Sequence, residues 1–115
     1  MPSRAIIVDD DSVNLYYAGK ILRSHGYETV ATDGYLTALE ALTGTPSDVL
    51  VADIRLGKSG SGLELARMAR KRQPTLKILL MTAYREEELN AKHAGFPIIR
   101  VPFTSRGFLT EIRNL

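Results

Sequence analysis

Short apolar runs alternate with helix-length amphipathic stretches along the whole of this 115-residue chain. The runs that predict strands are Ala5–Val8, Glu28–Thr32, Asp48–Ala52, Lys77–Thr82 and Pro97–Val101. The stretches that predict helices cover residues 12–25, 34–43, 62–72, 85–93 and 104–114. Strands separated by helices need crossover connections, which place the strands parallel in one sheet with helices packed on its faces. The pattern therefore predicts an α/β fold, a (βα)5 chain with a doubly wound parallel sheet.

The composition excludes several classes of function. The chain has no Cys, which excludes disulfides, thiolate metal sites and a cysteine nucleophile. A net charge of +2 gives no basic arm for direct binding to nucleic acid. The apolar runs are far shorter than the ~18 residues that cross a membrane, or the roughly 7–15 of a signal peptide's apolar region. We therefore expect one cytoplasmic domain, residues 1–115, that contacts neither nucleic acid nor membrane.

Polar side chains gather where the predicted strands end. Asp9 and Asp10 follow the first strand, Asp53 follows the third, and Thr82 ends the fourth. Ligands of doubly wound sheets bind beyond the carboxyl ends of the strands. If the first and third strands are neighbours, the carboxylates converge in one cleft, where like charges repel or need a cation. Mg²⁺ prefers such oxygen ligands, and an Asp beside it can attack a phosphoryl group. This pattern favours a Mg²⁺-dependent phosphoryl-acceptor site.

A simpler interpretation of such carboxylates is that they cap helices. Asp11, taken alone, suits an N-cap, because Asp is a preferred residue there. Capping explains less well why an acid pair, a single Asp and a hydroxyl stand at three strand ends on one side of the same sheet.

Several segments together carry a family resemblance. They are Ile7–Asp10, Ala52–Leu56, Ser61–Leu65, Leu79–Tyr84 and Pro102–Phe103. Over its whole length the chain resembles a response-regulator receiver domain of two-component signalling, of the CheY-like kind. The resemblance implies a flavodoxin-like sheet with strand order 2-1-3-4-5.

The resemblance also implies roles for individual residues. Asp53 would be the phosphorylated residue and, with Thr82, would form the catalytic pair. Asp10 would bind Mg²⁺ directly, Asp9 largely through water, and Asp53 and the backbone carbonyl of Arg55 would complete the metal site.

The resemblance further implies how such a domain signals. A sensor histidine kinase or a histidine phosphotransfer protein would donate the phosphoryl group, and a downstream protein partner would receive the signal. Thr82, Tyr84, Ile98 and Val101 would form the switch and output region. We expect a stand-alone signalling domain rather than an enzyme in the usual sense, as a monomer or a weak homodimer.

The chain departs from the family pattern at the fifth strand. Val101 stands where the family usually has a lysine that contacts the phosphoryl group, and Ile98 stands where an aromatic commonly rotates with the threonine. Arg100 is a poor substitute for that lysine, because successive strand residues face opposite ways. Arg55 or Lys58, in the loop after Asp53, could supply the charge, or both could remain in solvent.

Two spacings differ as well. The interval from Thr82 to Val101 is shorter than is usual, which clips the fourth helix and alters the usual output face. The loop after Asp53 has Gly57 where Pro is common, and one extra residue before Gly62. These departures keep open an alternative function, a receiver-like docking module that works without phosphorylation.

Overall fold

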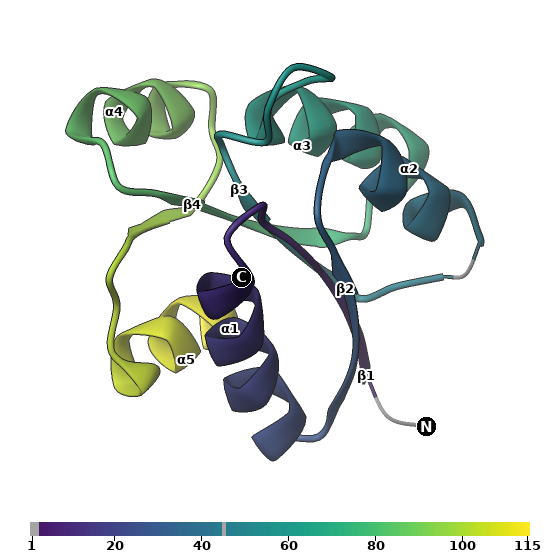
Figure 1. Ribbon diagram of the computed structural model, residues 1–115, viewed down its shortest axis with the longest axis vertical. Helices are drawn as coiled ribbons and strands as arrows, with labels where there is room; N and C mark the ends of the chain where they lie inside the picture. The colour runs from purple at the N-terminus through teal and green to yellow at the C-terminus, as the bar shows by residue number, and fades with distance from the viewer. Residues whose placement is uncertain (1–2, 45) are drawn as a thin grey trace.

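The sheet has the predicted strand order. In the computed structural model, which describes residues 3–44 and 46–115, five strands pair in parallel in the order β2-β1-β3-β4-β5 (Figure 1). The strands are β1 (Ser3–Val8), β2 (Tyr27–Thr32), β3 (Val49–Asp53), β4 (Lys77–Thr82) and β5 (Ile98–Arg100). The helices are α1 (Ser12–Ser24), α2 (Tyr35–Gly44), α3 (Gly62–Arg72), α4 (Arg85–His93) and α5 (Ser105–Arg113). The α/β (βα)5 prediction is confirmed.

The fifth strand is shorter than the predicted run of residues 97–101. β5 keeps only Ile98–Arg100, because a proline stands beyond each end and proline has no N–H to donate to a neighbouring strand. Val101 still donates its N–H to the carbonyl oxygen of Thr82 over 2.9 Å. The chain therefore stays beside β4 for one residue beyond the strand.

Helices cover both faces of the sheet. α1 and α5 pack on one face, and α2, α3 and α4 on the other (Figure 1). Side chains alternate along each strand, so that Ile6 of β1 enters the core under α2 and α3 while Ile7 enters the core under α1 and α5. Burial on both faces explains the apolar runs of the three central strands, β1, β3 and β4.

α4 is anchored weakly to the core. Throughout Arg85–His93, which the structure describes completely, Ala91 is the one buried residue. Glu88 of α4 pairs with Lys92 and with Arg100, each at 3.8 Å. The position of this helix therefore depends largely on polar contacts near its first turns.

No helix in the described ranges, 3–44 and 46–115, has the length and apolar character needed to cross a membrane.

The start of α3 is fixed by reciprocal capping. The side-chain hydroxyl of Ser61 accepts the N–H of Glu64 over 3.1 Å, and the Glu64 carboxylate accepts the N–H of Ser61 over 3.3 Å. Two N–H groups that the helix itself cannot satisfy are paired in this way.

Replacing Ser61 with Ala is expected to lower the free energy of unfolding by about 1 kcal/mol, the usual cost of losing an N-cap. Urea unfolding followed by circular dichroism measures the change. Ser59→Ala is the matched control, since Ser59 is exposed in the same loop. Equal stability of the two variants would contradict a stabilising role for this cap.

Candidate functional site

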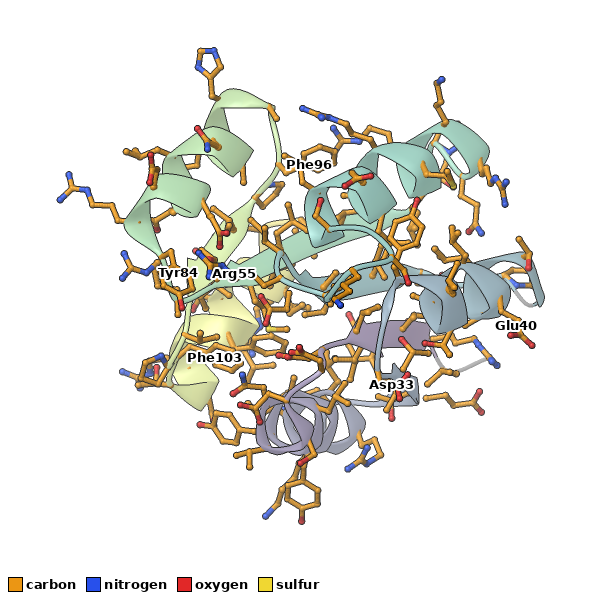
Figure 2. All side chains as sticks on the ribbon, turned by 45° about the horizontal axis from the view of Figure 1, so that its top comes forward. Asp33, Glu40, Arg55, Tyr84, Phe96 and Phe103 are labelled. Atoms are coloured by element: carbon orange, nitrogen blue, oxygen red, sulfur yellow. The ribbon has the colours of Figure 1, made fainter. Side chains whose placement is uncertain are left out.

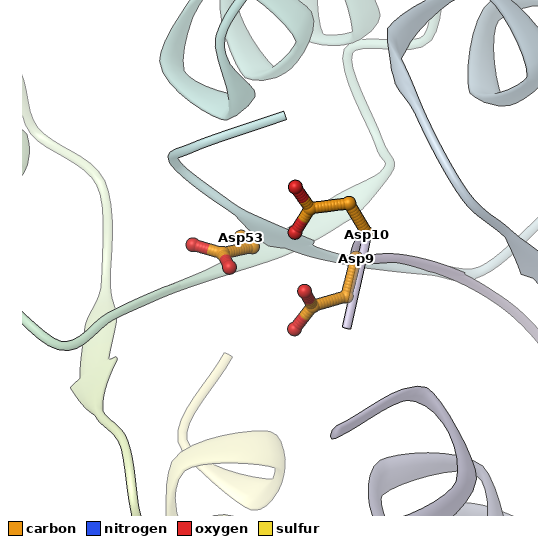
Figure 3. A group of neighbouring side chains, drawn as sticks. All are labelled: Asp9, Asp10 and Asp53. Atoms are coloured by element: carbon orange, nitrogen blue, oxygen red, sulfur yellow. The ribbon is translucent and has the colours of Figure 1, made fainter. Parts of the chain in front are cut away.

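Three carboxylates meet at the carboxyl edge of the sheet. Asp53 is the last residue of β3, and Asp9 and Asp10 directly follow β1. β1 and β3 are neighbours, with Val8 opposite Ala52, so the residues that follow are brought side by side. One carboxylate oxygen from each of the three lies within 4.8 Å of the other two (Figure 3). The sequence-based expectation that these residues converge is thus met by the geometry.

Asp9 is the most deeply buried of the three. Its side chain has no exposed surface, and its Oδ1 accepts the N–H of Asp11 over 2.9 Å. Its Oδ2 is buried without a hydrogen-bond partner among the described residues. A buried carboxylate oxygen without a partner is costly, so this atom has the character of a ligand for a cation.

Asp53 and Asp10 stand nearer to solvent. Asp53 is half-buried, and its Oδ1 accepts the backbone N–H of Arg55 over 3.2 Å, while Asp10 is exposed. The set therefore offers carboxylate oxygens at graded depths, from buried Asp9 to solvent-facing Asp10. Asp11, by contrast, caps α1, because its side chain accepts the N–H of Val13 over 2.8 Å.

Asp9 and Asp53 hold a proton more tightly than an ordinary carboxylic acid does. Burial, together with the negative charges on Asp9 and, less strongly, Asp10, raises the pKa of Asp53 to about 7. Burial is also the main reason that the pKa of Asp9 is raised. Near neutral pH Asp53 is therefore only partly ionised unless a cation offsets the repulsion.

The residues present fit a divalent cation that prefers oxygen ligands. The unpartnered Oδ2 of Asp9, the convergence of three carboxylates and the raised pKa values of Asp9 and Asp53 all suit a positively charged ligand. Mg²⁺ is bound in proteins by one or two carboxylates together with water and phosphate oxygens, and the three carboxylates at this edge of the sheet match that preference. The part of the Arg55 carbonyl in such a site stays a prediction.

Thr82 is already occupied by a partner that the sequence did not reveal. Its side chain is almost fully buried, and its hydroxyl donates to Oε1 of Glu87 over 2.7 Å. The same hydroxyl oxygen accepts the N–H of Tyr84 over 3.1 Å. Glu87 lies in the first turn of α4, five residues after Thr82, where an acidic residue also has the ordinary interpretation of stabilising the helix start.

Glu87 also holds Arg55. The Nε of Arg55 lies 2.9 Å from Oε2 of Glu87, and the guanidinium lies 3.7 Å from the centroid of the Tyr84 ring (Figure 2). The hydrogen bond with Glu87 is the main reason that the pKa of Arg55 is raised. The sequence left two alternatives for the Arg55 side chain, binding at the acid cluster or remaining free in solvent. The structure shows neither, because Glu87 holds the side chain beside the strand ends.

The other predicted switch residues lie on the two faces of the sheet. Ile98 is buried in the core under α2, α3 and α4, and Val101 packs with the core under α1 and α5. Phe103 stacks on Tyr17 and Phe108, with ring centroids 5.5 Å and 4.7 Å apart. Val101 thus adds an apolar side chain where the family usually has a charged one.

Comparison with known proteins agrees with this geometry. Residues 5–96 match the family model described as the response regulator receiver domain. The chain is 29% identical over 115 residues to the response regulator receiver protein CpdR of Brucella abortus, with 97% of this chain and 95% of that protein covered. It is 35% identical over 80 residues to the transcriptional regulator NtrC of Klebsiella pneumoniae, covering 70% of this chain but 17% of that protein.

Solved structures share the architecture. A CheY-like receiver domain protein from Methanospirillum hungatei superposes with a TM-score of 0.88 at 28% identity, covering 99% of this chain and 93% of that one. A receiver protein from Sinorhizobium medicae gives 0.88 at 25% identity, covering 98% and 93%.

Proposed function

The chain belongs to the family of response regulator receiver domains, and from that premise we propose that it accepts a phosphoryl group on Asp53 and signals through protein contacts. The observation that carries this proposal is the convergence of Asp9, Asp10 and Asp53 around the buried, unpartnered Oδ2 of Asp9. The donor in the proposal is a phosphohistidine on a sensor histidine kinase or on a histidine phosphotransfer protein.

The transfer would be a nucleophilic displacement at phosphorus. An oxygen of the ionised Asp53 carboxylate attacks the phosphorus, the P–N bond breaks, and the imidazole, protonated at its other nitrogen, leaves as a neutral ring. In dephosphorylation, which ends the signal, a water oxygen attacks the same phosphorus and the P–O bond to Asp53 breaks. Inorganic phosphate then leaves, the water's protons pass to phosphate and solvent, and the Asp53 carboxylate is restored.

Asp9, Asp10 and Asp53, with the backbone carbonyl of Arg55, are the groups that would hold Mg²⁺. When bound, the ion would neutralise carboxylate and phosphoryl oxygens as charge develops during transfer. Thr82 ends β4 beside β3, where Met81 is opposite Asp53, and in the proposal its hydroxyl donates to an oxygen of the transferred group. The raised pKa of Asp53 means that the nucleophile must lose its proton before it attacks.

The rest of the proposal follows the family. Residues 1–115 act as one receiver domain in the cytoplasm, as a monomer or a weak homodimer, without direct contact to nucleic acid. The domain catalyses its own phosphorylation and dephosphorylation and is not an enzyme in the usual sense. A downstream protein partner receives the signal. Relatives named CpdR and DivK, both described as response regulators, support this role.

Incubation with acetyl phosphate and Mg²⁺ is expected to add the mass of one phosphoryl group to the wild-type protein and none to Asp53→Asn. Intact mass spectrometry measures the addition. Asp33→Asn is the matched control, because Asp33 is an exposed carboxylate outside the cluster, and it should be labelled like the wild type. Absence of labelling in the wild type, or labelling of Asp53→Asn, would contradict the proposal.

The alternative, a docking module that works without phosphate, is favoured by one feature. Val101 places an apolar side chain in the core under α1 and α5 where the family has its phosphoryl-binding lysine. Under this alternative the Asp53→Asn protein keeps its cellular output unchanged, whereas phosphorylation-dependent signalling predicts that the output is lost.

A further inference from the structure

A phosphoryl group on Asp53 would bring more negative charge to an edge that already carries Asp9 and Asp10. A phosphorylated side chain carries about −1.5 to −2 charges near neutral pH, and such groups are usually held by a cation. With Val101 packed in the apolar core, the fifth strand does not provide that cation at the usual place. A cation that replaces the lysine must therefore come from the neighbouring loops.

Besides Arg85, which is exposed at the start of α4, three cations lie in the segments around the strand ends. Arg100 is directed elsewhere, since it pairs with Glu88 and donates to the carbonyl oxygen of Ala83 over 3.0 Å. Lys58 is exposed, and in the part of the chain that the structure describes no hydrogen bond or ion pair holds it. Arg55 alone of the three is tied to the acceptor, because its backbone N–H donates to the Asp53 carboxylate.

The side chain of Arg55 is held beside the site by groups that could release it. Glu87 accepts Arg55 with one carboxylate oxygen and the Thr82 hydroxyl with the other, at 2.9 Å and 2.7 Å. The ring of Tyr84 lies under the guanidinium and restricts it from the other side. A single carboxylate in the first turn of α4 therefore holds both the Arg55 guanidinium and the Thr82 hydroxyl.

We propose that Arg55 provides the phosphoryl-binding cation of this receiver, and that Glu87 holds Arg55 and Thr82 until phosphorylation of Asp53 draws both to the phosphoryl oxygens. This inference rests on the proposed function. It assigns Arg55 a direct contact and makes Glu87 a positioning residue that competes with the phosphoryl group.

The physical basis is a competition between two anions for the same donors. A guanidinium matches phosphate oxygens with two parallel N–H donors, and a phosphoryl group offers more charge and more acceptor oxygens than one carboxylate. The ion pair with Glu87 is largely exposed on the arginine side, so its loss costs little. In the exchange the side chain of Arg55 would move while its backbone stays next to Asp53, because its N–H already donates to the Asp53 carboxylate.

The test uses beryllofluoride, a phosphoryl mimic, in the presence of Mg²⁺. Its dissociation constant is measured by following backbone amide NMR signals of the wild type and of single variants. We expect Arg55→Ala to weaken binding about tenfold or more. Arg55→Lys should bind with an intermediate dissociation constant, because Lys keeps the positive charge but lacks the two parallel N–H donors of the guanidinium. Lys58→Ala, the matched control, should bind like the wild type.

Glu87→Gln should change binding in the opposite direction. Removing the competing charge frees Arg55 and Thr82, so we expect beryllofluoride to bind severalfold tighter, and this gain should vanish in the double variant with Arg55→Ala. A structural ion pair without this role would leave both single variants within twofold of the wild type, which would overturn the inference. Weakening by Lys58→Ala instead of Arg55→Ala would overturn it as well.

The outcomes separate this inference from the proposed function. If the wild type binds beryllofluoride and Asp53→Asn does not, the acceptor assignment stands whatever the Arg55 variants do. If the wild type binds none, both the proposed function and the role of Arg55 are overturned. Urea unfolding of every variant checks that changes in binding are not caused by loss of the fold.

Discussion

Replacing Gly62 with Ala is expected to destabilise the protein by about 3 kcal/mol, the upper end of the usual cost of overpacking. Gly62 begins α3, is buried, and donates its N–H to the carbonyl oxygen of Ile54 over 2.8 Å. A Cβ at this position would collide with the backbone carbonyl of Asp53, and its distance to the Cα of Ile54 would be only 3.0 Å. Backbone atoms of a central strand cannot rotate away, so the loop or the strand end must move.

Urea unfolding followed by circular dichroism measures this change, which is convenient because the chain has no Trp. Gly44→Ala is the matched control: Gly44 ends α2, and a Cβ there has nothing within 4 Å. This control should be neutral or stabilised by up to about 1 kcal/mol, since Ala favours helix over Gly. Equal stability of Gly62→Ala and the wild type would show that the contact between α3 and the end of β3 is looser than described.

Raising the pH from about 5 to 8 is expected to destabilise the wild type relative to Asp53→Asn. The pKa of Asp53 is raised from 3.8 to about 7 by folding, so between these values the folded protein binds a proton that the unfolded chain has lost. Stability must therefore fall as the pH rises through this window, and below about pH 4 the difference disappears. Asparagine does not titrate, so the free energy of unfolding of Asp53→Asn does not include this decrease with pH.

We expect Asp53→Asn to be more stable than the wild type by about 1–2 kcal/mol at pH 8 and by much less at pH 5. The full pKa shift would correspond to about 4 kcal/mol, but Asp53 is half-exposed and solvent screens the repulsion. Adding Mg²⁺ at pH 8 should close the gap, because a ligand at a hundredfold excess over its Kd stabilises by about 2.7 kcal/mol. Urea unfolding at both pH values tests this, and a gap that stays the same at pH 5 and 8 would refute it.

Much of the fold follows from local features of the sequence. Apolar runs buried on both faces predict parallel strands, and the alternation with helices predicts their crossovers. The meeting of Asp9 with Asp53 follows from the same topology, because parallel strands bring their carboxyl ends to one edge. This part of the site depends only on which strands are neighbours.

The polar contacts around Thr82 could not be predicted in this way. Whether Glu87 reaches Thr82 and Arg55 depends on how the first turn of α4 sits above the end of β4, and that placement results from tertiary packing. The side chains of Arg55 and Glu87 are also long and have many rotamers, so spacing along the chain does not fix their partner. The shortening of β5 is different, since the flanking prolines could have indicated it.

The weak anchoring of α4 has a consequence for how the molecule opens. Ala91 is a small side chain, and polar contacts of the helix run from Glu87 to Thr82 and Arg55 and from Glu88 to Arg100. Segments with few apolar contacts undock at a much lower free energy than the domain as a whole unfolds. A local release of α4, with the sheet and the other helices in place, is thus expected to cost less free energy than unfolding of the whole domain. Phosphorylation at the strand ends would therefore change the population of the state in which α4 is released, while the rest of the protein stays folded.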